Sequence, residues 1–588
     1  MNTHVSVKIG GDAHGLQFRS VQIHEALFAP CNIHVELGFK STEANSIYDK
    51  AASSWLGEKL VVTFGDKDDS AIDKKYEGVV TSLSLGTDTL ALIAQSEDHV
   101  MTVGRKHRAF VDKSVSDIVN DVVKANVNES SITNPSKSLK FTFLQQYEET
   151  DANLLRRLAR YDGCIFFHDG EKFMYMPEMG GGKSVSLELG HLSDVQMVCA
   201  LGLNKWKGAP YDYTKHTDPK NNSTDSGKYT PPPHPFASKT YDKSQSVYKN
   251  PVEEIYNEAV INNSQFGEFL SHQQSLAGGK LVKITGKTNH PMVAIGRTIK
   301  CKDHPILKDQ VVVTNIFTMF RELVYSSVFE AVSNKAAIME SEPNVRHHID
   351  LLQPAVVMDN KDKDKIGKVQ IKYLWDTKGN QLAWARLVQA AAGGSSGGSY
   401  GTHFIPRIGD HVLVGFENGD PSLPIIFGGL YHSETKPDFA TDNGTEEVLL
   451  VKTPRESTIR VLDKDGSEEI VVSMKDKKNL IRLELKEPKI TVESVQGTIL
   501  LHSKTIKLEA DEKIEMKAQN IEVNVQQNFK VDAKGNANME ATGNVNVKGT
   551  QGCVVEGTAS MTVKNGAGGE IAMSGPAVNI NKGALEVT

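Results

Sequence analysis

The acidic run Asp359-Asn360-Lys361-Asp362-Lys363-Asp364 is the segment whose residue types come nearest to those of a calcium-binding loop. Calcium is held by oxygen ligands, and the loop of the helix–loop–helix calcium site needs a tight-turn glycine and a bidentate glutamate at fixed positions. Here Gln370 stands where that glutamate would be, and Lys365 rather than glycine follows the last aspartate. We therefore interpret the run as a solvated linker.

Other candidate motifs are also incomplete. The glycine-rich loop 393–401 is not followed by the Lys-Ser/Thr of a phosphate-binding loop, and the histidine pair 347–348 has no third ligand nearby. Glu148 and Glu149 adjoin Asp151 at an expected helix start, where negative charge favours the helix dipole. Gly-x-Ser-x-Gly and His-Glu-x-x-His do not occur. The sequence thus predicts no catalytic residues, no metal ligands and no cofactor.

The composition is that of an ordinary water-soluble chain, with 588 residues, a net charge of −7 and a mean hydropathy of −0.33. The polar start and the lack of a long apolar run predict neither a cleaved leader nor a membrane-spanning helix. We expect the protein to be made and folded in a reducing cytoplasm. The cysteines lack C-x-x-C spacing, which argues against a metal knuckle or a disulfide framework; they are Cys31, Cys164, Cys199, Cys301 and Cys553.

A pattern with a period of about eight residues fills the last hundred residues, from Ile490 to Val587. Each repeat carries two apolar residues at i and i+2, a spacing that places both on one face of a strand. The residues predicted to form the core of the repeat are Ile506 with Leu508, Ile514 with Met516, Ile521 with Val523, Phe529 with Val531, Val545 with Val547, and Met561 with Val563.

Eight residues are too few for one coil of a single-chain β-helix, which needs roughly 18–25. The simplest closure winds three identical chains together, because each chain then supplies one strand per level and no lateral sheet edge is left open. Residues 476–588 carry equal numbers of basic and acidic residues, 14 each, and Phe529 is their only aromatic residue. A nucleic-acid reader needs a basic stripe and stacking aromatics, so we expect no nucleic-acid partner and predict a homotrimeric needle.

The rest of the chain divides into a mainly β N-terminal region and a smaller barrel. We assign residues 1–345 to two β-barrel units with inserted helices near Ser114–Ala125, Asp151–Tyr161 and Asn263–Leu276, and we interpret 205–250 as a long, partly mobile excursion. A linker at 346–365, an OB-type barrel at 366–435, a β-rich neck at 436–475 and the needle at 476–588 complete the predicted order.

Two stretches of sequence resemble a known family. The run Ile405-Pro406-Arg407-Ile408-Gly409-Asp410-His411-Val412-Leu413-Val414-Gly415-Phe416 closely resembles the OB-domain signature of VgrG proteins, the spikes of type VI secretion systems. The run from Glu149 to Gly163, which includes Leu154-Leu155-Arg156-Arg157-Leu158, resembles the helix of that family's hub domain. With the C-terminal repeat in the right order, the resemblance covers nearly the whole chain. The same plan is shared with the hub and spike of contractile phage tails.

This resemblance implies a non-enzymatic spike that punctures target membranes mechanically and delivers effectors on ejection from the cell. Its implied fold is a tube-adaptor hub, an OB-fold barrel and a triple-stranded intertwined β-helix. Its implied partners are an Hcp-type hexameric tube at the hub, baseplate proteins, secreted effectors and a PAAR-like tip protein at the C-terminus. We expect the tip protein to contact Gly583, Ala584, Leu585, Glu586, Val587 and Thr588.

Two rival functions remain at this point. The first is the baseplate spike of a phage-like or extracellular injection particle, which has the same architecture. The second is a hydrolase of cell-wall glycans, which needs a pair of acidic residues in a cleft. The near-neutral repeat and the roughly 50 residues between Tyr431 and the needle, with no inserted enzyme domain, argue against the hydrolase.

Overall fold

The computed structural model describes the chain from Thr3 to Ile580 and divides it into two compact units, Met1–Thr445 and Glu446–Thr588. Within these limits the described residues exclude 14, 67–68, 70, 138, 178–183, 211–223, 228–229, 233, 257–262, 335, 337–348, 378–381, 396–397, 438–447 and 575–576. The predicted tip contacts, Gly583 to Thr588, and the histidine pair 347–348 therefore lie outside the described residues.

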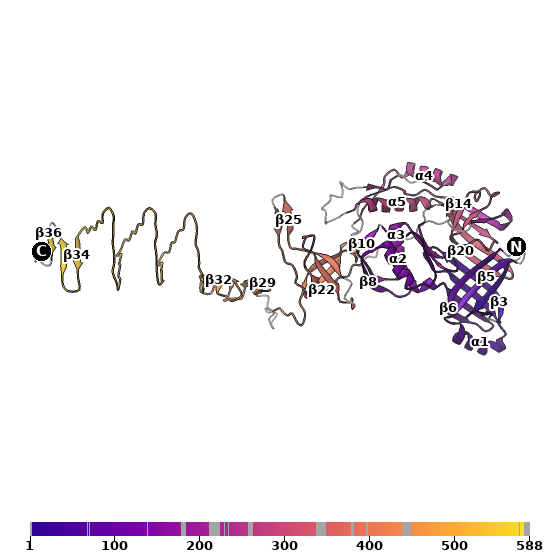
Figure 1. Cartoon of the computed structure of the whole chain (residues 1–588), viewed down its shortest axis with the longest axis horizontal. Helices are drawn as coiled ribbons and strands as arrows, with labels where there is room; N and C mark the ends of the chain where they lie inside the picture. The colour runs from indigo at the N-terminus through magenta and orange to yellow at the C-terminus, as the bar shows by residue number, and fades with distance from the viewer. Residues whose placement is uncertain are drawn as a thin grey trace. The chain divides into compact units, whose positions relative to one another are not determined.

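A sheet of 13 strands forms the larger part of the first unit (Figure 1). Alternating, β-branched segments near the N-terminus, such as Val5–Ile9 and Leu60–Phe64, lie in this sheet. The short helix α1 (Ala44–Lys50) connects two of its strands. The strands are β1 (Thr3–Ile9), β2 (Asp12–Ala13), β3 (Gln17–Ala26), β4 (Asn32–Gly38), β5 (Lys59–Asp66), β6 (Asp73–Leu85), β7 (Thr89–Gln95), β13 (Ser184–Ser186), β14 (Leu192–Cys199), β18 (Val282–Thr288), β19 (Thr298–Lys300), β20 (Val311–Arg321) and β21 (Val324–Ser333).

The two β units expected in residues 1–345 correspond to two separate hydrophobic cores on this sheet. One core gathers Val21, Val35, Leu60 and Phe64 from the N-terminal strands. The other gathers later residues, among them Ile284. The pairing of β20 with β3 joins the two halves edge to edge, so they form one continuous sheet instead of two separately closed barrels.

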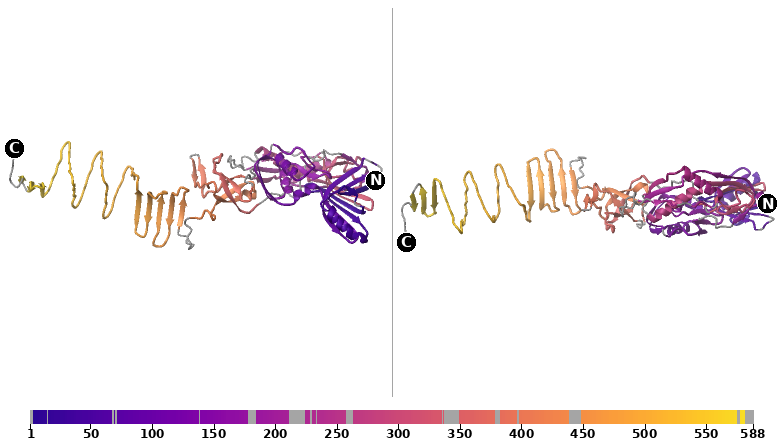
Figure 2. Two further views of the ribbon diagram at one scale, coloured as in Figure 1. Left: turned by 60° about the horizontal axis from the view of Figure 1, so that its bottom comes forward. Right: turned by 90° about the horizontal axis from the view of Figure 1, so that it is seen from above.

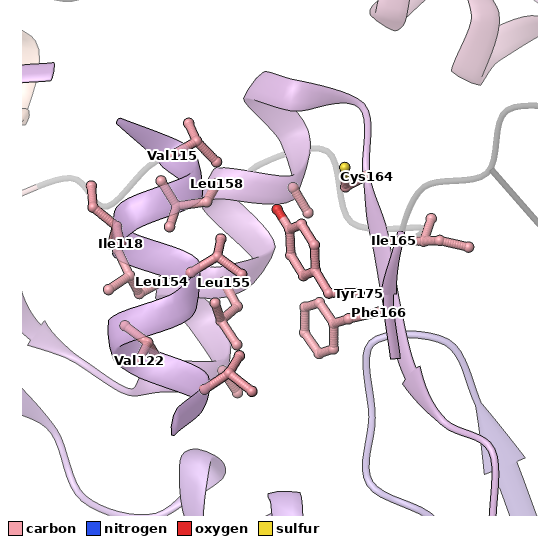
Figure 3. Close-up of a cluster of buried hydrophobic side chains, with 14 of the residues drawn as sticks. Val115, Ile118, Val122, Leu154, Leu155, Leu158, Cys164, Ile165, Phe166 and Tyr175 are labelled. Carbon is pink, nitrogen blue, oxygen red and sulfur yellow. The ribbon is translucent and has the colours of Figure 1, made fainter. Parts of the chain in front are cut away.

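A helical layer forms a third core in the first unit (Figure 3). Helix α2 (Val115–Lys124) is capped by a reciprocal pair of bonds between Ser114 and Asp117, and its apolar stripe is buried. Helix α3 (Asp151–Asp162) ends at Gly163, which has φ +70°. Both helices were predicted within two residues. The strands around them are β8 (Lys106–Ser114), β9 (Ser130–Ile132), β10 (Lys140–Glu149), β11 (Ile165–His168) and β12 (Phe173–Met176).

The predicted excursion at 205–250 contains regular structure, so its interpretation as a loop was wrong for the described residues. Helix α4 (Pro235–Val247) starts with a proline at its first position, which suits a helix N-terminus. Helix α5 (Asn263–Gly279) contacts a small sheet formed by β15 (Trp206–Pro210), β16 (Thr224–Asp225) and β17 (Val252–Tyr256).

The only closed barrel among the described residues follows the large sheet. Its five strands are β22 (Gln353–Asp359), β23 (Val369–Tyr373), β24 (Ala383–Leu387), β27 (His411–Phe416) and β28 (Pro424–Leu430). Strand β22 lies within the predicted linker 346–365, so that boundary was wrong. The acidic composition of the run at the end of β22 was interpreted as a solvated linker. In the structure this run is an ordered loop within the barrel, because Asp362 accepts bonds from the backbone N–H groups of Ile366 and Lys368.

A glycine corner and a tight turn shape this barrel. Gly409 has φ +94°, a conformation open mainly to glycine, and its N–H donates to Val357 across the corner. The turn at Asp420 is closed by a bond from the N–H of Leu423 to the Asp420 carbonyl. The glycine-rich loop forms a hairpin of β25 (Ala392–Ser395) and β26 (Gly398–Gly401).

The second unit begins with five strands that pair in sequence order (Figure 2). We call this sheet the meander sheet; its strands are β29 (Val448–Lys452), β30 (Thr458–Leu462), β31 (Glu469–Ser473), β32 (Asn479–Glu484) and β33 (Lys489–Ser494). After it comes a stretch without strands, and a second meander of β34 (Ser560–Lys564), β35 (Glu570–Ser574) and β36 (Ala577–Ile580) follows. No helix in the described part of the chain is both long and apolar enough to span a bilayer.

Candidate self-association surface

Residues 498–559, which we call the shaft segment, are extended but form no strand within the chain. All of these residues are described, and no backbone–backbone hydrogen bond is formed by any of them. Figures 1 and 2 show the segment running back and forth as a zigzag. Its bends fall at 504, 511–512, 519, 526–527, 534–535, 542–543, 550–551 and 558–559. The spacing of these bends confirms the eight-residue period predicted from the apolar residues.

The twelve apolar residues predicted as the core of the repeat form no core within the single chain. Met561 is half-buried, and each of the other eleven has between 50% and 73% of its surface exposed. The physical reason is that no strand or layer of the described chain covers this side of the repeat. Their burial between chains therefore stays a prediction. The eleven exposed residues are Ile506, Leu508, Ile514, Met516, Ile521, Val523, Phe529, Val531, Val545, Val547 and Val563.

These residues form one apolar stripe, because i and i+2 lie on the same side of an extended chain. Ten of the twelve predicted residues lie on the shaft segment, and Met561 and Val563 follow directly on β34. Burying a side chain of this size is worth about 1.5–3 kcal/mol. A continuous stripe of this extent marks a protein interface.

A third column of residues, at position i+4 of each repeat, was not predicted from the sequence. It lies on the same side as the stripe and next to the bend, and it is filled mainly by small residues, with Val525 as the large exception. The signal that could have revealed this column is the recurrence of a small residue about every eight positions. Its members on the shaft segment are Ser503, Ala510, Ala518, Val525, Ala533, Ala541, Gly549 and Gly557.

The opposite side of the shaft segment is mainly polar, with Leu500 and Val554 as apolar exceptions. Lys513 and Glu515 lie 2.7 Å apart, and Lys530 and Asp532 lie 3.0 Å apart, with all four side chains well exposed. Such surface pairs contribute little to stability. They show instead that the residues alternating with the stripe face water. The segment is therefore amphipathic, with one side and all its backbone groups unpaired in the single chain.

The meander sheet also exposes an apolar surface, but its strands pair with one another within the chain. Val472 pairs with Ile459 and Ile481, and Leu483 pairs with Ile470 and Ile490, so these residues share one face. The needle was predicted to start at 476, and this was wrong. Strands β32 and β33 pair within the chain, because hairpin turns at 474–479 and 485–488 fold them back. The i, i+2 pattern is the same in both kinds of pairing.

The buried ionic groups of the first unit hold structure together. Asp151 receives hydrogen bonds from Lys106, Arg108, Gln146 and Asn126. Burial alone would raise the pKa of Asp151, but the bonds from Lys106 and Gln146 and the charge of Arg108 outweigh it and hold that pKa below its ordinary value. The cap of α3 is Thr150, whose side chain accepts from Asn153, and not Asp151.

The second acid at this helix start also has a fixed partner. Arg157 donates to Glu149 at 2.8 Å, and both side chains are almost fully buried. Burial tends to lower the pKa of Arg157, but the Glu149 carboxylate raises it further. The described residues contain no group of three or more His, Cys, Asp or Glu side chains placed to hold a metal ion. The apolar stripe is therefore the strongest candidate for function.

Two family models match the chain in the order of its parts. The model for the phage tail baseplate hub (GPD) matches residues 24–323, more than half of the chain. The model for the type VI secretion system/phage-baseplate injector OB domain matches residues 353–431, which coincide with the closed barrel.

Individual relatives give the same picture. The type VI secretion system spike protein VgrG3 of Vibrio cholerae is 24% identical over 69% of this chain and 42% of its own length. The actin cross-linking toxin VgrG1 of the same species is 23% identical over 65% of this chain and 37% of its own length. The chain thus spans less than half of each. A solved Francisella PdpA–VgrG complex has the same fold, with a TM-score of 0.54 and 10% identity over 84% of this chain and 88% of the other.

Proposed function

Because the chain belongs to the phage tail baseplate hub family, we propose that it is the trimeric hub and spike of a contractile injection machine of the type VI secretion kind. The observation that carries this proposal is the exposed apolar stripe with unpaired backbone on the shaft segment. A strand of eight residues cannot close a coil alone, so three chains must share each level.

The three parts of the chain have distinct roles in this proposal. Residues 1–345 dock onto a hexameric tube of Hcp type, since two β cores per chain in three chains offer six β units to a sixfold ring. The OB barrel is the base of the spike and meets baseplate proteins. The shaft segment is the rigid rod that punctures a target membrane mechanically, while a PAAR-like tip protein at Gly583–Thr588 sharpens it.

The proposed role is structural and needs no catalysis, cofactor or nucleic acid. The carboxylates of Glu149 and Asp151 are occupied by Arg157, Lys106 and Arg108. The chain is assembled in the bacterial cytoplasm and leaves the cell through the contractile machine with the effectors it carries. A phage-like or extracellular particle is the rival expected from the sequence, and the relatives named as type VI secretion system spike proteins do not favour it. The genes beside the coding sequence separate the two, because only a secretion system encodes a membrane complex.

Secretion of the tube protein tests the proposed function. In the strain that encodes this chain, deletion of its gene should abolish release of the hexameric tube protein into the medium. The wild-type gene should restore release, and a Val547→Asp gene should not, because its shaft cannot assemble. Normal tube release in the deletion strain, with no second spike gene present, would refute the proposed function.

A further inference from the structure

The eight-residue repeat leaves the alignment of neighbouring chains undetermined. Levels of the shaft segment differ little from one to the next, so a chain displaced by one repeat would still place apolar residues beside apolar residues. Register must therefore be set by a part of the chain that does not repeat with this period. We infer that the meander sheet packs against the same sheet of two other copies and sets the register of the shaft. This inference rests on the proposed trimer.

The meander sheet is complete before any partner arrives. Its five strands are paired within the chain in sequence order, each with its neighbour through a short turn. Contacts of such low sequence separation form quickly and need no other chain. The shaft segment has no such pairing within the chain. The meander sheet can therefore fold first, and the shaft segment can pair only after chains have met.

The two faces of the meander sheet differ in character. One face carries the exposed residues Ile459, Ile470, Val472, Ile481 and Leu483. This face is hollowed at both ends. One hollow of about 590 Å³ includes Val461, Ile470, Leu483 and Ile490 in its lining, and another of about 460 Å³ includes Val451, Ile459, Val472, Ile481 and Val492. Side chains of a facing sheet would fill such hollows.

The other face carries the charged residues of the sheet, and its apolar residues, such as Val471 and Leu480, are already buried within the chain. Glu469 pairs with Arg460 and lies 3.8 Å from Arg482, and the two arginines flank Val471, which is buried. A sheet with one apolar and one charged face buries the apolar one. The occupant is a second and third copy of this chain, because the apolar face runs directly into the stripe of the shaft segment, whose closure needs three chains.

The native residue Cys553 supplies a reporter of register. It stands at the i position of its repeat, in the same column as Val545 and Met561, and it is exposed in the single chain. Three chains in register bring three Cys553 thiols to one level, where mild oxidation joins two of them. Cys199 is the other exposed cysteine among the five and is changed to Ser in every variant.

The first experiment co-expresses the full chain with a chain that lacks residues 521–528, one complete repeat upstream of Cys553. Trimers that contain both chains are isolated with a tag on the shorter chain and are then oxidised. If the meander sheet sets the register, Cys553 of the two chain types lies one level apart, and cross-links between unlike chains should be at least fivefold rarer than those between like chains. Equal yields would overturn the inference, as would a complete absence of mixed trimers, because either result places the alignment in the shaft itself.

A matched pair of substitutions tests the face directly in the full chain. Ile481→Asp puts three carboxylates into the proposed contact, and Thr491→Asp adds the same charge on the opposite face, beside Arg482. Thr491→Asp should keep the cross-link yield, and Ile481→Asp should reduce it severalfold or yield single chains. Wild-type yield in Ile481→Asp would contradict the inference. A monomeric wild-type protein would instead refute the proposed trimer, so the two failures are distinguishable.

Discussion

Ile481 of β32 lies directly opposite Val472 of β31, and the two side chains are 46% and 44% exposed although they are cross-strand partners. Two apolar residues that pair within a sheet are normally covered on the outer side by another layer. Here the described chain supplies no covering layer, and the same holds for the stripe on the shaft segment. This missing layer is the physical basis of the proposal that the chain is a trimer.

Val547→Asp should disrupt the trimer. In the assembly three carboxylates would meet near one axis without partners, and an unpaired buried charge costs several kcal/mol. The change should lower the melting temperature of the spike and shift the solution mass towards the single chain. Lys548→Asp is the matched control, because Lys548 is the next residue and faces the polar side. The axial position of Val547 would be contradicted if both variants behaved alike.

Arg157→Ala should destabilise the hub strongly. Arg157 is the buried partner of Glu149, and its removal leaves a carboxylate at 1% exposure without its cation. Breaking a buried pair in this way costs about 3–5 kcal/mol. The urea midpoint of the hub transition, followed by fluorescence, measures the effect.

Arg105→Ala is the control for this change. Arg105 lies 3.9 Å from Glu148 with both side chains exposed, and loss of such a pair costs about 0–1 kcal/mol. Equal losses for Arg105→Ala and Arg157→Ala would show that the buried pair has no special role in hub stability.

Hub stability should fall as the pH rises from about 4 to about 6, because one buried carboxyl group, that of Asp162, loses its proton. Burial raises the pKa of Asp162 to about 6, although bonds from Cys164, Ser136 and Tyr175 oppose the rise. The folded pKa exceeds the unfolded one, so the contribution of Asp162 is fully present below pH 4 and is lost as the pH passes 6. The full loss is of order 3 kcal/mol.

Asp162→Asn provides the comparison, because the amide oxygen still accepts from Tyr175 but carries no charge. Urea unfolding between pH 4 and 7.5 should show a flatter stability profile for this variant than for the wild type. Asp121→Asn, at an exposed carboxylate that pairs with Lys113, should leave the profile unchanged. A wild-type slope retained in Asp162→Asn would assign the pH dependence to other groups.

Sequence patterns predicted those elements whose signal is local. The apolar stripe was sufficient for α2, and the helix was found within one residue at each end. The i, i+2 pattern located the apolar face of the repeat, because a strand face depends only on alternation.

The errors arose where the decisive contact is distant or the pattern is shared. Helix α4 has few apolar residues and follows prolines, so its burial against β14 and β18 could not be anticipated. Strand β22 was assigned to a linker because its partners β23 and β27 lie further along the chain. Strands β32 and β33 pair within the chain, whereas the shaft segment is proposed to pair between chains. Both carry the same apolar pattern, so the pattern alone cannot tell the two kinds of pairing apart.

The mass of the full-length protein in solution tests the central claim most directly. Light scattering on the purified protein, over a range of concentrations, should give three times the chain mass of 64.4 kDa. A folded protein that remains at 64.4 kDa at all concentrations would contradict the account, because the apolar stripe from Ile506 to Val563 would then remain without partners.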